Sequence, residues 1–163
     1  MTGGPILLPD GGVQNIQFTF VNDLAESFVL AASTQNAAGR IYNIAQTEIT
    51  SLRNFLDECA RHLGVSPTYV EAPSKWIGLL GGPFAHATPT LLDISRATSE
   101  LGLRPTPFTD FTKLTSDWFK ENPPDENEIR NVLRSRRAEI RLCRFLRMAQ
   151  PLLTPLFINK NML

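Results

Sequence analysis

The apolar residues of this chain fall into short blocks of two kinds. Compact apolar runs, typical of strands, lie at residues 5–9, 17–21, 41–44 and 67–70. Tracts with an apolar residue at every third or fourth position, typical of helices, begin near residues 23, 51, 75, 93, 109 and 125. This alternation predicts the α/β class, yet the strands are too few for a complete parallel sheet. We therefore expect part of the sheet to be missing from this sequence.

Boundary signals define the two helices in the first half of the chain. Thr50 or Ser51 is expected to cap a helix that ends at Gly64. Asp23, three residues before Glu26, is expected to cap an earlier helix. In that earlier helix, Leu24, Phe28, Ala31 and Ala32 are predicted to share one face.

The second half contains one more amphipathic helix and then a boundary. Thr109 is expected to cap this helix, and its predicted inner face consists of Phe111, Leu114, Trp118 and Phe119. Pro123-Pro124 bars a helix and removes two donors, so we place a boundary there, with one part at 1–124 and a tail at 125–163. The tail is predicted to be helical over 125–148, and its apolar end to be broken by Pro151 and Pro155.

Charge is balanced overall but not along the chain. The 163 residues contain 16 basic and 16 acidic side chains, so no whole-molecule field recruits nucleic acid. Residues 1–120 contain 8 basic and 11 acidic side chains, a net −3, whereas residues 121–163 contain 8 and 5, a net +3. The carboxyl-terminal segment is therefore the basic part of the protein.

The cysteines and the amino-terminal residues indicate the cellular compartment of the protein. Cys59 and Cys143 stand at apolar helix positions, which predicts small buried hydrophobes rather than a disulfide. The amino terminus has neither a basic segment nor a long apolar run, and no stretch reaches the ~18–20 apolar residues of a membrane span. We expect a cytoplasmic protein.

Four segments carry a family resemblance. In chain order they are 11–12 with 18–25 (GG and FTFVNDLA), 39–44 (GRIYNI), 93–97 with 100–105 (DISRA and ELGLRP), and 117–119 with 121–122 (DWF and EN). Together they resemble the carboxyl-terminal part of extended short-chain dehydrogenases/reductases, the NAD-dependent epimerase/dehydratase family. The resemblance covers residues 3–122. It implies the substrate-binding part of an extended Rossmann-type fold, in an enzyme that uses NAD or NADP.

The residues that perform chemistry in this family are not found in the sequence. There is no T-G-x-x-G-x-x-G turn for the pyrophosphate, and the cluster at 78–82 precedes a proline. The family's Tyr–Lys pair is also missing, because Tyr42 is followed at +4 by Gln46 and Tyr69 by Pro73. Neither histidine belongs to a cluster with metal-ligand spacing. We assign no catalytic, cofactor-binding or metal residue, and we expect no turnover from the chain alone.

The resemblance suggests where substrate would bind. Leu7 and Pro9 occupy the strand that, in the family, often faces a nucleotide base, although packing on the core accounts for them equally well. Gln17 lies beside the position where sugar-nucleotide epimerases often have an arginine, here Ile16. A second arginine is expected near residues 83–86, where His86 could donate to a substrate oxygen. Losing two phosphate contacts would weaken a diphosphate ligand by roughly 100-fold or more, which favours a less charged substrate.

The basic tail allows three interpretations. Residues 128–147 hold seven arginines and two glutamates, with a stripe of apolar residues at helical spacing. The tail could pack on the missing Rossmann half or on a second subunit. It could instead contact a membrane surface peripherally through 128–158, where apolar residues continue. Nucleic-acid binding is not predicted, because no accompanying motif is present.

The sequence leads to two hypotheses. In the first, the chain is the substrate-binding half of an NAD(P)-dependent epimerase, dehydratase or reductase, and its partners are a small-molecule substrate and the missing Rossmann half. In the second, it is a non-catalytic interaction or membrane-peripheral module derived from that family. In either case the apolar surface that would face the Rossmann sheet is expected to be bare.

Overall fold

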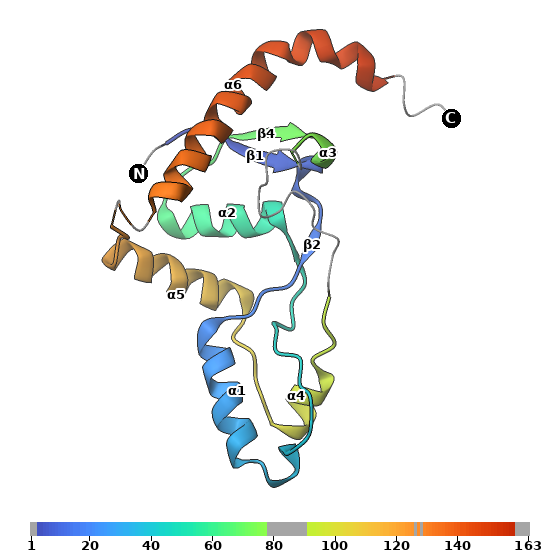
Figure 1. Cartoon of the computed structure of the whole chain (residues 1–163), viewed down its shortest axis with the longest axis vertical. Coiled ribbons are helices and arrows are strands. Elements are labelled where there is room, and N and C mark those ends of the chain that lie inside the picture. Colours follow the sequence, from blue (N-terminus) through green and yellow to red (C-terminus); the bar gives the residue numbers. More distant parts are fainter. Residues whose placement is uncertain (1–2, 78–90, 126, 128, 159–163) are drawn as a thin grey trace. The chain divides into compact units, whose positions relative to one another are not determined.

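The computed structural model describes residues 3–77, 91–125, 127 and 129–158 (Figure 1). The chain divides into two compact units. The first comprises residues 1–12, 66–86 and 123–163, and the second comprises residues 13–65 and 87–122.

The first unit is built on a parallel pair of strands. Strand β1 (Ile6–Pro9) pairs with β4 (Tyr69–Ala72), with Leu8 opposite Glu71. A 3-10 turn, η1 (Asp10–Gly12), follows β1, and the short helix α3 (Ser74–Ile77) follows β4. The strand predicted at residues 5–9 is confirmed, and the strand predicted at 67–70 lies two residues further on.

Helix α6 (Arg130–Ile158) completes this unit, and its amino-terminal half packs on β1 and β4 (Figure 1). Glu139 accepts a 2.8 Å hydrogen bond at Oε1 from the backbone N–H of Leu7. Arg136 donates to the carbonyl oxygens of Gly4 and Pro5 at 2.9 and 2.8 Å. Cys143 is fully buried on the same face. These bonds join residues more than 130 positions apart, so the amino terminus and the tail fold together.

The helix boundaries in the tail differ from those predicted. Helix α6 begins at Arg130 rather than at residue 125, and it runs through Pro151 and Pro155 to Ile158. Each proline removes one backbone hydrogen bond and favours a bend, but it does not have to end a long helix. The predicted break at these prolines is therefore wrong.

The second unit consists of helices around a small antiparallel pair. Strand β2 (Asn15–Ile16) pairs with β3 (Thr50–Ser51). The helices are α1 (Val21–Ser33), η2 (Gln35–Ala37), α2 (Leu52–Leu63), α4 (Ser95–Glu100) and α5 (Phe108–Glu121). Helices α2 and α5 lie side by side (Figure 1).

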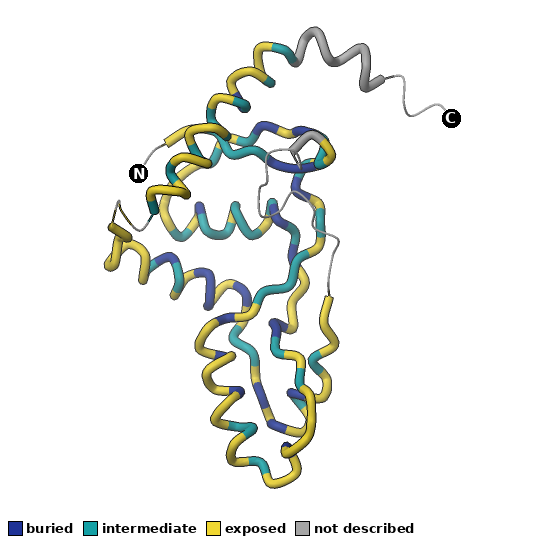
Figure 2. The backbone as a smooth tube through the Cα atoms, in the orientation of Figure 1, coloured by how far each residue is buried: buried dark blue, intermediate teal, exposed yellow. Residues whose placement is uncertain are grey.

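Aromatic rings form the core of this second unit. Phe20, Phe108 and Phe111 are buried, and Phe18 and Phe55 pack against them. The ring centroids of Phe18 and Phe55 are 4.4 Å apart, and those of Phe20 and Phe111 are 5.8 Å apart. Such offset pairs contribute about 0.5–1.5 kcal/mol each beyond the area they bury. Figure 2 shows that buried and exposed positions alternate along α5, so one side of this helix faces the core.

The boundaries of α2 confirm the prediction made from its end signals. Ser51 is the N-cap, and its hydroxyl accepts a 3.1 Å bond from the Asn54 N–H. Gly64 ends the helix in the left-handed conformation at φ 67°. Serine supplies the acceptor and glycine tolerates the positive φ, so both ends follow from local chemistry.

Two predicted strands do not form. Residues 17–20 and 41–44 are assigned to no strand, and Ile41 is 81% exposed. Single hydrogen bonds stand in place of a ladder. The Gln46 N–H donates to the Phe18 carbonyl at 2.8 Å, Thr19 Oγ1 donates to the Ile44 carbonyl at 2.7 Å, and Asn43 Nδ2 donates to the Asp93 carbonyl at 3.0 Å. Side-chain donors therefore supply part of the hydrogen bonding in these two apolar runs.

The predicted inner face of α5 is confirmed at Phe111 alone, and the shared apolar face predicted for α1 is not its buried face. Helix α1 buries the polar Asp23 and Ser27, whereas Phe28 is 69% exposed. Helix α5 buries Phe108, Phe111, Thr112 and Ser116. Its other large apolar side chains, Leu114, Trp118 and Phe119, are more than half exposed. Periodicity identifies an apolar stripe but does not specify whether this chain or another surface covers it.

Both cysteines are free, as predicted. Cys143 is buried and Cys59 is partly buried, and burial raises the pKa of each thiol. Neither thiol is therefore activated as a nucleophile. Within the described residues, no helix has the length and apolar content needed to cross a bilayer.

Candidate substrate-side site

The turn after β1 lies at the carboxyl ends of β1 and β4, the edge where α/β sheets usually bind ligands. Asp10 adopts a positive φ of 44°, and Gly11 and Gly12 both have φ 71°. Asp10 Oδ1 accepts a 2.9 Å hydrogen bond from the Ser74 N–H. Hydrogen bonds from the Ser74 side chain and backbone lower the pKa of Asp10. The Asp10 carboxylate thus joins the turn to the start of α3.

Gly12 is required by space as well as by conformation. A Cβ at this position would lie 2.6 Å from Leu8 Cδ1, and Leu8 is fully buried. The same atom at Gly11 would meet only the Glu71 carboxylate, at 3.5 Å. The glycine pair therefore brings the turn into contact with the strand it leaves.

Leu7 and Pro9, predicted to contact substrate, lie on β1. Leu7 is half-buried and packs with Leu146 against Ala72, while Pro9 is buried. These contacts favour the packing interpretation for Leu7. The assignment of either residue to substrate stays a prediction.

Gln17, the third predicted residue, bridges two segments of the second unit. Its Oε1 accepts from the Leu92 N–H at 2.8 Å, and its Nε2 donates to the carbonyl oxygens of Leu92 and Gln46 at 3.4 and 2.6 Å. The amide thus pairs with both backbone groups of Leu92, 75 residues away. The assignment of Gln17 to substrate stays a prediction.

Gln46 is a residue that the sequence did not single out as a site. Its side chain is fully buried, and neither Nε2 nor Oε1 has a hydrogen-bond partner. A buried amide without partners costs about 1–3 kcal/mol, so it needs a compensating role. The only sequence signal is its position, four residues after Tyr42, where a family-type pair would have a lysine.

Replacing Gln46 by leucine is expected to stabilise the free chain by about 1 kcal/mol, because an unsatisfied amide gives way to an apolar group. Gln17→Leu, which removes three hydrogen bonds, is expected to destabilise it by about 2 kcal/mol. Urea unfolding would show a higher midpoint for Gln46→Leu and a lower midpoint for Gln17→Leu than for the parent chain. An equal loss of stability in both variants would mean that the Gln46 amide is hydrogen-bonded in solution.

Asp23 is not a helix cap, which corrects the sequence expectation. Helix α1 begins at Val21, and Asp23 lies inside its first turn, 5% exposed. Its Oδ2 accepts from the Thr106 N–H at 2.9 Å and its Oδ1 accepts from the Thr106 hydroxyl at 2.6 Å. The carboxylate therefore ties α1 to the segment that enters α5.

An exposed charged cluster surrounds Tyr42. The Tyr42 hydroxyl donates to Glu100 at 2.9 Å, and Arg40 and Arg96 lie 4.0 and 3.9 Å from the same carboxylate. Desolvation and the Glu100 carboxylate raise the pKa of Tyr42, whereas an acid/base tyrosine needs a lowered one. The cluster is structural in character.

The four predicted substrate residues are not brought together within one unit. Leu7 and Pro9 belong to the first unit, Gln17 belongs to the second, and His86 lies outside the described residues. Among the residues that the structure describes, no three His, Cys, Asp or Glu side chains could hold a metal ion.

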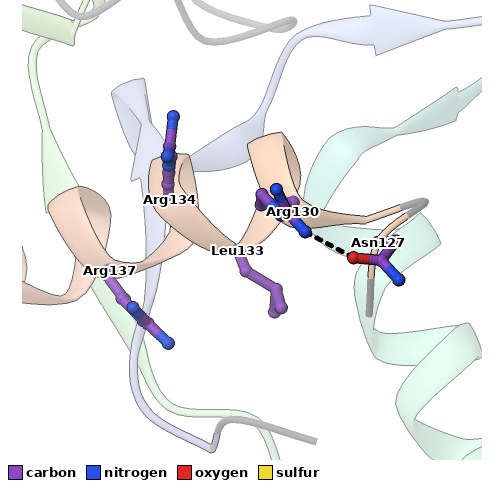
Figure 3. Close-up of a pocket in the computed structure, with 5 residues that line it drawn as sticks. All are labelled: Asn127, Arg130, Leu133, Arg134 and Arg137. Carbon is purple, nitrogen blue, oxygen red and sulfur yellow. Dashed lines mark hydrogen bonds between the residues drawn. The ribbon is translucent and has the colours of Figure 1, made fainter. Parts of the chain in front are cut away.

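One pocket of the first unit is lined by the start of α6. It measures about 260 Å³, and its wall consists of Asn127, Arg130, Leu133, Arg134 and Arg137 (Figure 3). The Arg130 guanidinium donates to the Asn127 side-chain oxygen. The pocket is therefore positively charged and suits an anion rather than a dinucleotide ring system.

Solved structures share the fold of this chain. The UDP-glucuronic acid 4-epimerase of Bacillus cereus in complex with NAD is 26% identical, with a TM-score of 0.54, and the match covers 71% of this chain and 33% of that one. The UDP-glucose 4-epimerase of Thermotoga maritima with UDP-glucose is 18% identical, with a TM-score of 0.56, and the match covers 74% and 36%.

A third solved structure matches a larger share of this chain. The Bordetella bronchiseptica enzyme WbmF in complex with NAD⁺ and UDP is 23% identical, with a TM-score of 0.57, and the match covers 85% of this chain and 37% of that one. The chain thus spans about a third of the length of these proteins. No family model and no curated protein matches it. The resemblance to the extended short-chain dehydrogenase/reductase family and the α/β class with an incomplete parallel sheet are confirmed.

Proposed function

We propose that this chain is the substrate-binding portion of an NAD(P)-dependent epimerase, dehydratase or reductase. The observation that carries the proposal is the agreement of two results. Four family segments occur in order over residues 3–122, and the fold matches about a third of the length of NAD-complexed epimerases. The dinucleotide and the catalytic pair would belong to the remaining portion, whether it is joined to this chain or supplied by another subunit.

The cofactor is accordingly assigned to the complete enzyme and not to this chain. NAD or NADP needs a glycine-rich turn that lets the backbone approach the pyrophosphate. The glycines at η1 do not supply one, because the space beside Gly12 is filled by the Leu8 side chain, where an added Cβ would lie 2.6 Å from Leu8 Cδ1. Large apolar side chains on α1 and α5 are exposed. Their exposure supports the proposal that another surface covers them in the complete enzyme, either the Rossmann half or a second subunit.

The proposed substrate is less charged than a nucleotide sugar. Ile16 takes the place of a phosphate-binding arginine, and Gln17 uses its amide on Leu92 and Gln46. Gln46 is a further polar candidate, because the unpartnered donor and acceptor of its amide suit an uncharged hydroxyl or carbonyl group. Gln46 is therefore proposed as a substrate contact in the complete enzyme, in addition to Leu7, Pro9, Gln17 and His86.

The proposal is tested by reading the coding DNA directly upstream of Met1. An in-phase or adjacent frame that encodes T-G-x-x-G-x-x-G and Y-x-x-x-K is the expected result. A ribosome-binding site at Met1 with neither motif nearby would contradict the proposal and favour the second candidate.

The second candidate is a non-catalytic interaction module derived from the same family. The exposed apolar side chains on α1, among them Val21, Phe28 and Val29, favour an interaction with another protein surface. In this case the chain would form stable complexes without any dinucleotide-dependent chemistry.

A further inference from the structure

A line of arginines runs along one face of α6. Arg130, Arg134, Arg137, Arg141 and Arg144 follow one another at intervals of four and three residues, and all of them are exposed. This spacing places successive side chains one above the other on a single helix face. We call these five residues the arginine stripe.

The stripe lies opposite the face that packs on the strands. Glu139 and Cys143, which face β1, are about half a helical turn away from Arg137 and Arg141. Arg136 belongs to the packed face, since it donates to Gly4 and Pro5 and lies 2.8 Å from Glu139. The stripe is therefore not needed to hold α6 on β1 and β4.

The charge of the stripe is not neutralised within the described structure. Glu139 is the one acidic residue of α6, and it is already engaged by Leu7 and Arg136. Four guanidinium groups of the stripe make no hydrogen bond or ion pair with the side chain or backbone of a described residue; they belong to Arg134, Arg137, Arg141 and Arg144. Like charges three and four residues apart destabilise a helix. An anionic partner would remove that repulsion.

The amino-terminal part of the stripe is also concave. Arg130, Arg134 and Arg137 line the 260 Å³ pocket together with Asn127 and Leu133 (Figure 3). Guanidinium groups bind phosphate oxygens in a bidentate manner, and the Asn127 amide adds a further donor. The pocket thus suits a phosphate group of a larger anionic surface.

Apolar side chains continue the same line of the helix. Phe145 and Met148 follow Arg144, and they are 60% and 72% exposed. The sequence continues this spacing with Leu152 and Leu156. Helices that lie in a bilayer interface combine basic side chains, which meet the headgroups, with exposed large apolar side chains, which enter the acyl boundary. Nucleic acid would leave Phe145 and Met148 without a partner.

We propose that the outer face of α6 docks on an anionic phospholipid membrane. The arginine stripe binds headgroup phosphates, with one in the pocket of Arg130, Arg134 and Arg137, and Phe145 and Met148 enter the boundary between headgroups and acyl chains. The helix lies on the membrane and does not cross it. This inference is independent of the proposed function, because it involves neither substrate nor cofactor.

Co-sedimentation of the full chain with vesicles tests the proposal. The vesicles are pure phosphatidylcholine or phosphatidylcholine with about 30% phosphatidylserine, the anionic lipid of charged leaflets. Binding is expected to the anionic vesicles alone at low salt, and it is expected to weaken as salt shortens the screening length. Equal binding to both vesicles, or no binding at low salt, would overturn the proposal.

Variants identify the face that binds. R134Q/R137Q/R141Q is expected to weaken binding about 100-fold, as three charges near an anionic surface would. R134K/R137K/R141K keeps the charge and is expected to retain most of the binding. The matched control R40Q/R61Q/R104Q removes three exposed arginines of the second unit and is expected to bind like the parent chain. Circular dichroism checks that each variant folds.

Two further outcomes would overturn the proposal. One is a stripe variant that folds and binds vesicles as the parent chain does. The other is tight binding of a short DNA duplex that vesicles fail to displace, since this would make the stripe a nucleic-acid surface.

Discussion

Gly12→Ala is expected to destabilise the first unit by about 3 kcal/mol. Overpacking of a full core costs about 1–3 kcal/mol, and a left-handed conformation costs a non-glycine residue about 1–2 kcal/mol. Both terms apply here, because Gly12 has φ 71° and its added Cβ would lie 2.6 Å from the buried Leu8. Hydrogen exchange over residues 5–12 and 66–72 measures the effect, and about 100-fold faster exchange of the β1–β4 amides is expected.

Gly11→Ala is the matched control for this prediction. Gly11 has the same φ of 71°, but its added Cβ would meet only the Glu71 carboxylate, at the ordinary contact distance of 3.5 Å. It therefore incurs the conformational term alone, about 1–2 kcal/mol. Equal effects of the two substitutions would show that Leu8 moves aside at little cost, and the proposed close approach of turn and strand would be wrong.

Asp23→Ala is expected to destabilise the second unit by about 2–4 kcal/mol. The substitution removes a buried charged acceptor and leaves the backbone N–H and the hydroxyl of Thr106 without it. Hydrogen bonds to charged groups contribute about 1.5–3 kcal/mol each, and donors left without an acceptor add a desolvation cost. Urea unfolding followed by hydrogen exchange in residues 21–33 and 104–108 measures the loss.

Two variants separate the hydrogen bonds of Asp23 from its charge. Glu26→Ala removes an exposed carboxylate from the same helix and is expected to change stability by less than about 0.5 kcal/mol. Thr106→Val removes the hydroxyl bond but keeps the backbone bond, so about half of the Asp23→Ala effect is expected. A Glu26→Ala loss as large as that of Asp23→Ala would point to charge alone and contradict the tie between Asp23 and Thr106.

Local signals predicted those parts of the fold that depend on neighbouring residues. The ends of α2 follow from the Ser51 hydroxyl and from the conformational freedom of Gly64, and the turn after β1 follows from its glycines. The parallel strand pair was predicted only as an incomplete sheet, because no local pattern specifies which runs pair. Long-range pairing depends on contacts that a window of residues does not contain.

The faces of α1 and α5 show what periodicity leaves out. Both helices have an apolar stripe, but this chain buries Asp23 and Ser27 of α1 and leaves Phe28 exposed. Burial is decided by the surface that a helix meets. Thr106 provides hydrogen-bond donors for Asp23, and the described residues provide little cover for Phe28.

The candidate site was predictable in part for a related reason. Leu7, Pro9 and Gln17 were chosen by their place in the family pattern, and each one is now seen to have structural contacts. The bond from Gln17 to Leu92 spans 75 residues, so no local rule could anticipate it. Gln46 became notable only once its burial and its unpartnered amide were known.

The most direct test of the central claim is an activity assay on the purified chain. The claim is that residues 1–163 form a substrate-side portion without a dinucleotide site or a Tyr–Lys pair. The chain would be incubated with NAD or NADP and with alcohol, ketone and nucleotide-sugar substrates, while reduced cofactor and epimerised product are followed. No turnover above the protein-free background is the predicted result, and cofactor-dependent turnover by the chain alone would contradict the account.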